Sequence, residues 1–204
     1  MIFGKRKSQT KLILASGSPR RAEILRNAGF EFDVHLTHAD ESRRARETAA
    51  RYAQRVAAAK ARAAAEKFRE KHSRVIVIGA DTVVLAKGTI LGKPSDVKDA
   101  RRMLRLLNGK THRVLTGLAA VSLPDGAERQ HVETTRVRFR RMSNAEIDDY
   151  IATGEPFGKA GGYAIQGIAG RYVTEIEGCY FNVMGLPLAR LYELLETLRW
   201  RAPQ

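Results

Sequence analysis

The segment Ser16-Gly-Ser-Pro-Arg-Arg21 brings two hydroxyls and two guanidinium groups close together. The apolar run at residues 12–15 predicts a buried strand, and Ser18 with Pro19 is typical of a helix start that Gly29 would end. Both arginines would then lie in the first helical turn, where the helix dipole is already positive. A bound phosphate would resolve this conflict, because free N–H groups, hydroxyls and guanidiniums all favour an anion. Taken alone, the segment leaves open a capped helix with solvated arginines.

Asp81 is the strongest single candidate for catalysis. It directly follows residues 74–80, an apolar run that predicts a central buried strand ending at Asp81 and Thr82. Because α/β proteins bind ligands at the ends of sheet strands, a carboxylate there could bind a divalent ion or act as a general base towards water. A turn aspartate without a ligand is the alternative.

Two glycine-rich segments each place a lysine where it could reach a phosphate. They are Gly88-Thr-Ile-Leu-Gly-Lys93 and Gly154-Glu-Pro-Phe-Gly-Lys159. Neither is a P-loop, because each is one residue short between the glycines and lacks the Ser or Thr that would bind Mg²⁺. The lysines still carry point charges that suit phosphate. The second segment continues as a glycine-dense loop to Gly167, and long loops of this kind are usually functional.

The remaining pattern predicts the elements that must position these groups. Strands are predicted at residues 32–35, 83–86, 90–91, 113–123, 128–140 and 172–176. Helices are predicted at residues 46–71, from 95 or 96 to 107, from the capping box at Ser143 to Gly154, and at 187–200. Strands and helices alternate early and hairpins follow, which indicates an α/β fold with a mixed sheet. We expect one domain over residues 1–204, with a basic disordered tail at residues 1–10.

Composition narrows the class of protein. The 204-residue chain has a net charge of +14, which favours polyanionic partners such as nucleotides, nucleic acid or an acidic membrane surface. Its single cysteine, Cys179, excludes a disulfide framework and fits a reducing compartment. No apolar run approaches the ~20 residues of a membrane span, and residues 1–11 lack the apolar core of a signal peptide. We therefore expect a cytoplasmic protein.

Several of these segments together resemble the Maf family of nucleoside triphosphate pyrophosphatases. The similar segments occur in order over about residues 11–198, and so many coincidences make the resemblance specific. They are Leu12-Ile-Leu-Ala-Ser-Gly-Ser-Pro-Arg-Arg-Ala-Glu-Ile-Leu, Gly79-Ala-Asp-Thr-Val-Val, Leu91-Gly-Lys-Pro, Thr116-Gly-Leu, the loop from Gly154 to Gly167, and Ile176-Glu-Gly-Cys-Tyr-Phe-Asn-Val-Met-Gly-Leu-Pro-Leu.

The resemblance implies an elongated mixed sheet with a cleft between two lobes, similar to the inosine triphosphate pyrophosphatase group. It implies cleavage of a nucleoside triphosphate to the monophosphate and pyrophosphate with Mg²⁺ or Mn²⁺, with Asp81 as proton acceptor. Arg20, Thr82 and Gln166 match the family's positions of substrate choice and resemble the branch that acts on dTTP and UTP. The family is also linked to septum formation, cell-division arrest and the clearing of modified nucleotides.

Two departures from the family pattern concern the cleft. Gly162 stands where many members carry Ala, and the acidic loop reads Ala39-Asp-Glu-Ser rather than the commoner Ile-Asp-Glu. The second departure bears on whether Asp40 or Glu41 helps to bind the metal.

A mechanistic hypothesis assigns each candidate residue a role. Ser16, Ser18, Arg20 and Arg21 would hold the phosphates, and Lys60, Lys93 and Lys159 would add positive charge. Glu41 and Asp81 would hold the metal, Asp81 would activate water, and Thr82 and Gln166 would read a pyrimidine edge.

Other readings stay open. The net charge suggests a non-catalytic nucleic-acid-binding or cell-division regulatory protein, although the basic segments contain few aromatic residues. The same enzyme class acting on 7-methyl-GTP, or an enzyme of this fold acting on another phosphate ester, is a further alternative. We expect a nucleotide substrate, no membrane and no stable nucleic-acid complex, and leave a homodimer open.

Overall fold

A computed structural model describes residues 10–70 and 74–201 of the chain. Its strands are β1 (Lys11–Ala15), β2 (Phe32–Val34), β3 (Val75–Ala86), β4 (Thr89–Leu91), β5 (Thr111–Leu123), β6 (Glu128–Phe139) and β7 (Val173–Glu177). Its α-helices are α1 (Pro19–Asn27), α2 (Ala49–Ala65), α3 (Val97–Leu107), α4 (Asn144–Ala152), α5 (Tyr180–Met184) and α6 (Leu188–Thr197). Three short 3₁₀ turns cover Glu66–Phe68, Ala160–Gly162 and Ile168–Tyr172.

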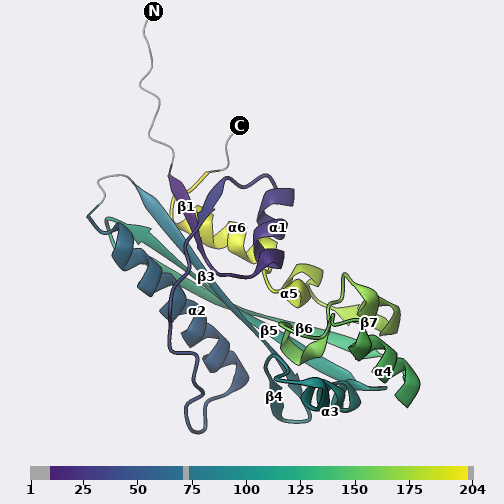
Figure 1. Cartoon of the computed structure of the whole chain (residues 1–204). Coiled ribbons are helices and arrows are strands. Elements are labelled where there is room, and N and C mark those ends of the chain that lie inside the picture. The colour runs from purple at the N-terminus through teal and green to yellow at the C-terminus, as the bar shows by residue number, and fades with distance from the viewer. Residues whose placement is uncertain (1–9, 71–73, 202–204) are drawn as a thin grey trace, which may run out of the picture.

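One mixed sheet runs the whole length of the molecule, as predicted (Figure 1). Its strand order is β2-β1-β3-β5-β6-β7, and β4 pairs with β3. β1 is parallel to β2 and β3, and the other neighbouring pairs are antiparallel. The long strands β3, β5 and β6 therefore connect the two ends of the molecule.

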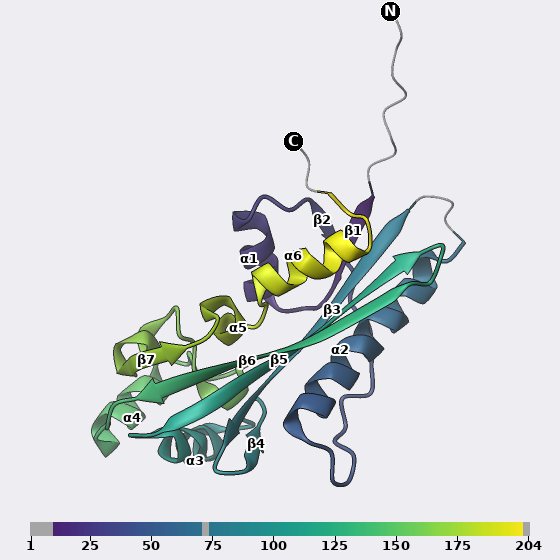
Figure 2. The same cartoon turned by 180° about the vertical axis from the view of Figure 1, so that it is seen from behind.

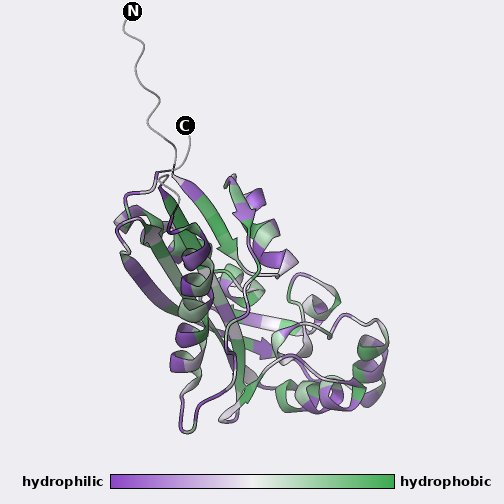
Figure 3. Ribbon diagram, turned by 60° about the vertical axis from the view of Figure 1, so that its left-hand side comes forward, coloured by the Kyte–Doolittle hydropathy of each residue, from purple (hydrophilic) through white to green (hydrophobic). Residues whose placement is uncertain are grey.

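Helices cover the two ends of the sheet differently and give two lobes. At one end, α2 packs on one face of the sheet while α1 and α6 pack on the other (Figures 1 and 2). At the other end, α3, α4 and the glycine-rich loop enclose a separate hydrophobic core around Leu104, Phe139 and Tyr150. The sheet is apolar along its central strands, and hydrophilic residues follow the exposed side of α2 (Figure 3). The prediction of an elongated α/β fold with two lobes is confirmed.

β3 corrects the predicted position of Asp81. We expected a strand that ends at Asp81, followed by a hairpin, but the strand continues to Ala86, and Asp81 lies in its middle. The strand does not stop at the polar pair because Asp81 and Thr82 remain in register with Gly117 and Thr116 of β5. The predicted hairpin itself is present, with β3 and β4 pairing around Lys87 and Gly88.

The alanine-rich helix α2 lies unusually close to the sheet. A Cβ atom on Gly79 of β3 would come within 2.2 Å of the carbonyl oxygen of Ala57, and one on Gly117 of β5 within 2.2 Å of that of Ala53. Only glycine on the strands and small residues on the helix permit this approach. The helix itself is shorter than the predicted residues 46–71, because Thr48 caps its first turn and a 3₁₀ turn follows Ala65.

Most other predicted elements are confirmed with small shifts at their ends. Asp96 caps α3, and Ser143 and Glu146 form the predicted capping box of α4. The five-residue α5 was not predicted, because it is too short to show a helical period. The predicted basic tail lies, apart from Thr10, outside the described residues, as does the end of the predicted long helix at Lys71.

Replacing Gly117 with Ala should destabilise the protein by about 1–3 kcal/mol, because the new methyl group would overpack the contact between β5 and α2. Urea denaturation measures this change. Gly92→Ala is a matched control, since no atom lies within 4 Å of its added Cβ, and it should change stability by less than about 0.5 kcal/mol. Equal stability of the two variants would contradict the close approach of α2.

Candidate functional site

A cavity lies beside the part of β3 that pairs with neither β1 nor β4. β1 pairs with β3 up to Gly79, and β4 pairs with β3 only from Val84 onwards. Between these two points the edge of β3 faces a cavity of about 320 Å³. The carboxyl end of the parallel strand β1 lies at the same place, so the rule that ligands bind at strand ends applies to β1 rather than to β3.

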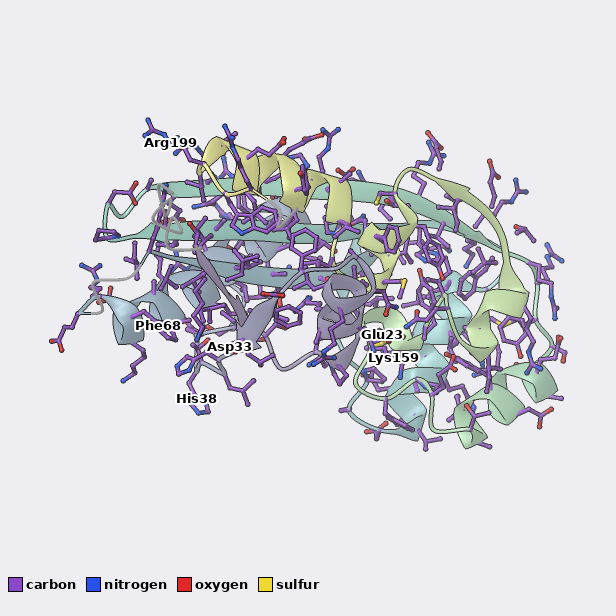
Figure 4. The ribbon with its side chains drawn as sticks, turned by 90° about the horizontal axis from the view of Figure 1, so that it is seen from above. Glu23, Asp33, His38, Phe68, Lys159 and Arg199 are labelled. Carbon is purple, nitrogen blue, oxygen red and sulfur yellow. The ribbon has the colours of Figure 1, made fainter. Side chains whose placement is uncertain are left out.

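Nearly all the candidate residues named from the sequence meet at this cavity. It is lined by Ser16, Ser18, Arg20, Arg21, Glu41, Lys60, Asp81, Thr82, Lys93 and Gln166. Lys159 is not among the lining residues, although its neighbours Gly158 and Ala160 are. Lys159 on the glycine-rich loop and Glu23 on α1 are labelled in Figure 4.

Asp81 is held by an ion pair with Lys60 of α2. The Lys60 Nζ atom lies 2.8 Å from Asp81 Oδ1 and 2.9 Å from Glu41 Oε1, so it bridges the two carboxylates. Asp81 is only 8% exposed, whereas the Glu41 side chain is 54% exposed. The buried carboxylate is thus fixed in one position, while Glu41 approaches it from the solvent side.

The two carboxylates fit a magnesium or manganese ion by the chemistry of their oxygen atoms. Mg²⁺ is usually held by one or two carboxylates together with waters and substrate phosphates, rather than by a full set of protein ligands. Glu41 and Asp81 supply such a pair. Among the described residues, no group of three or more His, Cys, Asp or Glu side chains forms a metal cage. This donor set matches a metal that arrives with a phosphorylated substrate.

Arg21 is part of a buried hydrogen-bond network. Its guanidinium donates to Ser16 Oγ at 2.8 Å, to Thr82 Oγ1 at 3.0 Å and to the carbonyl oxygen of Gly185 at 2.8 Å. Burial lowers the pKa of Arg21, and the nearby Asp81 carboxylate partly opposes this effect. Because Arg21 is only 8% exposed, it fixes the serine loop as well as adding charge to the cavity.

The Thr82 hydroxyl is already engaged by its neighbours. It accepts from Arg21 and lies 3.0 Å from the hydroxyl of Thr116, which in turn donates to the carbonyl oxygen of Asn182. A hydroxyl has a single proton to donate, and Thr82 directs its proton to Thr116 or to the carbonyl oxygen of Gly185, which lies 3.5 Å away. Thr82 can therefore offer a ligand its methyl group and a lone pair rather than a proton.

Arg20 and Lys159 are two cations without a carboxylate partner within 4 Å among the described residues. Burial lowers the pKa of Arg20, and burial together with the charge of Arg20 lowers the pKa of Lys159. Neither side chain forms an ion pair within residues 10–70 and 74–201. Lys93, which is exposed on the loop after β4, also lacks an ion-pair partner in that part of the chain. These cations are available to an anionic ligand.

The inner end of the cavity is apolar. Val84, Val114, Tyr163, Val183 and Met184 line it. The Tyr163 hydroxyl lies 2.8 Å from Nε2 of the buried His112, whose pKa burial lowers to about 4, so the imidazole is neutral at physiological pH. The cavity therefore offers charge at the serine loop and a hydrophobic wall deeper inside.

The loop that carries Glu41 is held by α2 through contacts that the sequence analysis missed. The Arg55 guanidinium binds both carboxylate oxygens of Glu47, at 2.7 and 2.9 Å, and the carbonyl oxygen of Ser42 at 2.8 Å. The Tyr52 hydroxyl donates to the carbonyl oxygen of Glu41 at 2.9 Å. We expected most charged residues of this helix to be solvated. No sequence signal separates Arg55 from its neighbours, because its partners lie in an irregular loop before the helix.

The Glu47–Arg55 pair predicts a pH dependence. Hydrogen bonds from Arg55 hold the pKa of Glu47 at about 2, against 4.5 for the free side chain. Since the folded-state pKa is depressed, the stabilisation is complete above about pH 4.5 and is lost as the pH falls towards 2. Glu47→Gln should therefore be less stable than the wild type at pH 7, and the difference should shrink between pH 4.5 and 2.

Urea denaturation across this pH range measures the effect. The exposed Glu196 of α6 offers a matched control, and Glu196→Gln should follow the wild type at every pH. A stability difference for Glu47→Gln that stays constant from pH 7 to pH 2 would contradict the assigned pair.

Comparison with known proteins finds several relatives that carry the same name. It is 50% identical over 184 residues to a protein from Koribacter versatilis named dTTP/UTP pyrophosphatase, covering 90% of this chain and 92% of that protein. A protein of the same name from Hahella chejuensis is 47% identical, with 96% of each chain covered. One from Vibrio vulnificus is 46% identical, covering 91% of this chain and 97% of that protein.

Solved structures are more distant. The Staphylococcus aureus Ham1 protein matches with a TM-score of 0.49 and 12% identity, covering 93% of this chain and 100% of that one. A nucleoside-triphosphatase from Mycobacterium abscessus, titled dITP/XTP pyrophosphatase, matches with a TM-score of 0.35 and 18% identity over 65% of this chain and 74% of that one. The model of the Maf-like protein family matches residues 11–198. With that match and relatives at up to 50% identity, the chain belongs to the Maf family.

Proposed function

We propose that the protein hydrolyses dTTP and UTP to the monophosphate and pyrophosphate. The observation that carries the proposal is the cavity itself, where the largely buried Asp81 carboxylate lies beside Lys60, and Arg20 and Lys93 line the same cavity. The relatives named dTTP/UTP pyrophosphatase support the same activity. Such a combination of one fixed carboxylate and several cations suits the attack of water on a polyanionic phosphate.

The serine loop and the cations bind the triphosphate. Ser16 and Ser18 offer hydroxyls, and Arg20 offers a guanidinium fork whose shape matches phosphate oxygens. Lys93 also lines the cavity, and Lys159 lies between two residues, Gly158 and Ala160, that line it. In this proposal, these cations would neutralise the charge of the departing pyrophosphate.

Asp81 acts as the general base. Its carboxylate accepts a proton from the water whose oxygen forms the new bond to the α-phosphorus, and the bond from that phosphorus to the bridging oxygen breaks. The pyrophosphate leaves with the bonding electron pair. Lys60 holds the Asp81 carboxylate in position through their ion pair. Glu41 and Asp81 would hold the divalent ion, Mg²⁺ or Mn²⁺, which supplies further neutralisation of phosphate charge when bound.

Gln166, Thr82 and Arg20 select the nucleotide. The Gln166 side chain is exposed at the cavity and forms no hydrogen bond within the described ranges, so its amide is free to donate and accept. Thr82 contributes a methyl group and an acceptor. A pyrimidine edge that presents both an N–H and carbonyl oxygens suits this pair, whereas a mismatched base would leave the amide unpaired.

Location stays a prediction from the composition, and a role in septum formation or cell division stays a prediction from the resemblance. Across the described residues, no helix has the length and apolar character required to cross a bilayer. We propose that the protein is cytoplasmic and forms no stable complex with nucleic acid. A homodimer stays open.

Asp81→Asn should lower the rate of pyrophosphate release from dTTP by about 10²–10⁴-fold, the usual contribution of a general base. The assay measures pyrophosphate release with Mg²⁺ at pH 7–8. Asp125→Asn in the exposed turn between β5 and β6 is the matched control and should keep full activity. Near wild-type turnover by a folded Asp81→Asn protein would remove Asp81 from the role of base.

A nucleotide panel tests the substrate assignment and its rivals. We expect turnover of dTTP and UTP, with CTP and 7-methyl-GTP at least tenfold poorer in kcat/KM. Exclusive turnover of 7-methyl-GTP would overturn the assignment. Absence of turnover, combined with tight and steeply salt-dependent binding to duplex DNA, would favour the nucleic-acid-binding alternative.

A further inference from the structure

The loop between α4 and the 3₁₀ turn Ile168–Tyr172 carries two of the proposed substrate contacts, Lys159 and Gln166. It contains several glycines with left-handed backbone angles, including Gly158 and Gly161. Its only regular structure is the short 3₁₀ turn Ala160–Gly162. A segment of this kind holds its side chains in place only if other contacts fix it.

The Glu155 carboxylate joins both ends of this loop. Its Oε1 atom accepts hydrogen bonds from the Tyr150 hydroxyl at 2.8 Å and from the Ala169 N–H at 3.2 Å. Its Oε2 atom accepts from the Ile168 N–H at 2.9 Å. One side chain at the start of the loop therefore binds helix α4 and the backbone at the end of the loop, directly after Gln166 and Gly167.

Gly167 shows how closely the carboxylate fits. A Cβ atom added to Gly167 would lie 2.2 Å from Glu155 Oε2. A side chain here would have to displace the Glu155 carboxylate, although the backbone φ of Gly167, −108°, is open to any residue. The carboxylate thus packs against the residue that follows Gln166.

Glu155 differs from the protein's other buried or half-buried acids in its partners. Burial raises the pKa of Glu155, but hydrogen bonds from Ile168, Tyr150 and Ala169 outweigh burial, and the net pKa is lowered. Within the described residues Glu155 has no ion-pair partner. Backbone N–H groups and a tyrosine hydroxyl stabilise the negative charge of Glu155. In the part of the chain that the structure describes, the carboxylate therefore binds only groups that belong to the loop and to α4.

We propose that Glu155 is a positioning residue that closes the loop and thereby places Gln166 and Lys159 at the cavity. The inference rests on the proposed function for its link to substrate, but the closure of the loop can be tested without any nucleotide. Glu155 itself does not line the cavity, so it acts through these two residues.

The first experiment compares amide hydrogen exchange of residues 159–168 in the nucleotide-free full-length protein. Glu155→Gln should accelerate exchange in this loop by at least about tenfold, because the amide removes the negative charge and one strong acceptor. Glu146→Gln is the matched control: Glu146 also lies on the α4 side of the molecule and accepts hydrogen bonds, but from Arg140 and Ser143. It should leave exchange in the loop unchanged.

The second experiment is a double-mutant cycle on dTTP hydrolysis. Gln166→Ala should raise KM by about tenfold in the wild-type background, the value of one good hydrogen bond, and by less than about twofold in the Glu155→Gln background. Such non-additivity follows if Glu155 acts through Gln166, and a merely structural role would not produce it. Additive effects, or unchanged loop exchange in Glu155→Gln, would overturn the proposal.

One further variant, together with the exchange measurement itself, keeps the test decisive. If Glu155→Gln does not fold, Tyr150→Phe removes only one of the three hydrogen bonds and should produce a smaller change of the same sign. If the wild type hydrolyses no nucleotide, the proposed function fails, while the exchange experiment still decides whether Glu155 closes the loop.

Discussion

The close approach of α2 to the sheet is the constraint on which the site depends. Gly79 and Gly117 let the helix backbone touch β3 and β5, where any side chain would hold it away. This contact brings Lys60, one residue before Ala61, to the Asp81 carboxylate two residues after Gly79. A shift of the helix by a single side-chain thickness would separate the ion pair. The geometry of the candidate active site therefore depends on a packing contact between glycine and alanine residues, whose side chains carry no reactive group.

A second constraint is the gap between β1 and β4 along β3. A strand in the middle of a sheet normally has its backbone edges covered, which would leave a residue such as Asp81 out of a ligand's reach. Here the short β1 ends at Ala15, opposite Gly79, and the short β4 ends at Leu91, opposite Val84, so the central strand is open between them. Asp81 is thereby both largely buried, which fixes its carboxylate, and open to the cavity. Thr82 faces the other side of the strand and connects the same gap to Arg21.

Local patterns predicted much of the fold, and contacts between distant segments explain what was missed. The capping box at Ser143 and the cap at Asp96 depend on residues three positions apart, and both are confirmed. The end of β3 was predicted wrongly because the polar pair Asp81–Thr82 looks like a strand end, and only the pairing with β5 keeps the strand going. The candidate site residues were named from the sequence, but the roles of Arg55 and Glu155 were not. Arg55 binds the Glu47 carboxylate and a carbonyl oxygen, and Glu155 binds the Tyr150 hydroxyl and two N–H groups. Most of these partners lie in irregular loops, whose placement no local sequence pattern predicts.

The distribution of charge connects the fold to the kind of ligand it can bind. Many surface cations already have carboxylate partners, such as Arg101 with Asp148, Arg136 with Glu177 and Arg190 with Glu133. These exposed pairs contribute little stability. At the cavity the balance differs, because burial lowers the pKa of Arg20, Arg21 and Lys159 together. Because burial disfavours the charged form of these side chains, an anionic ligand beside them would stabilise their charge.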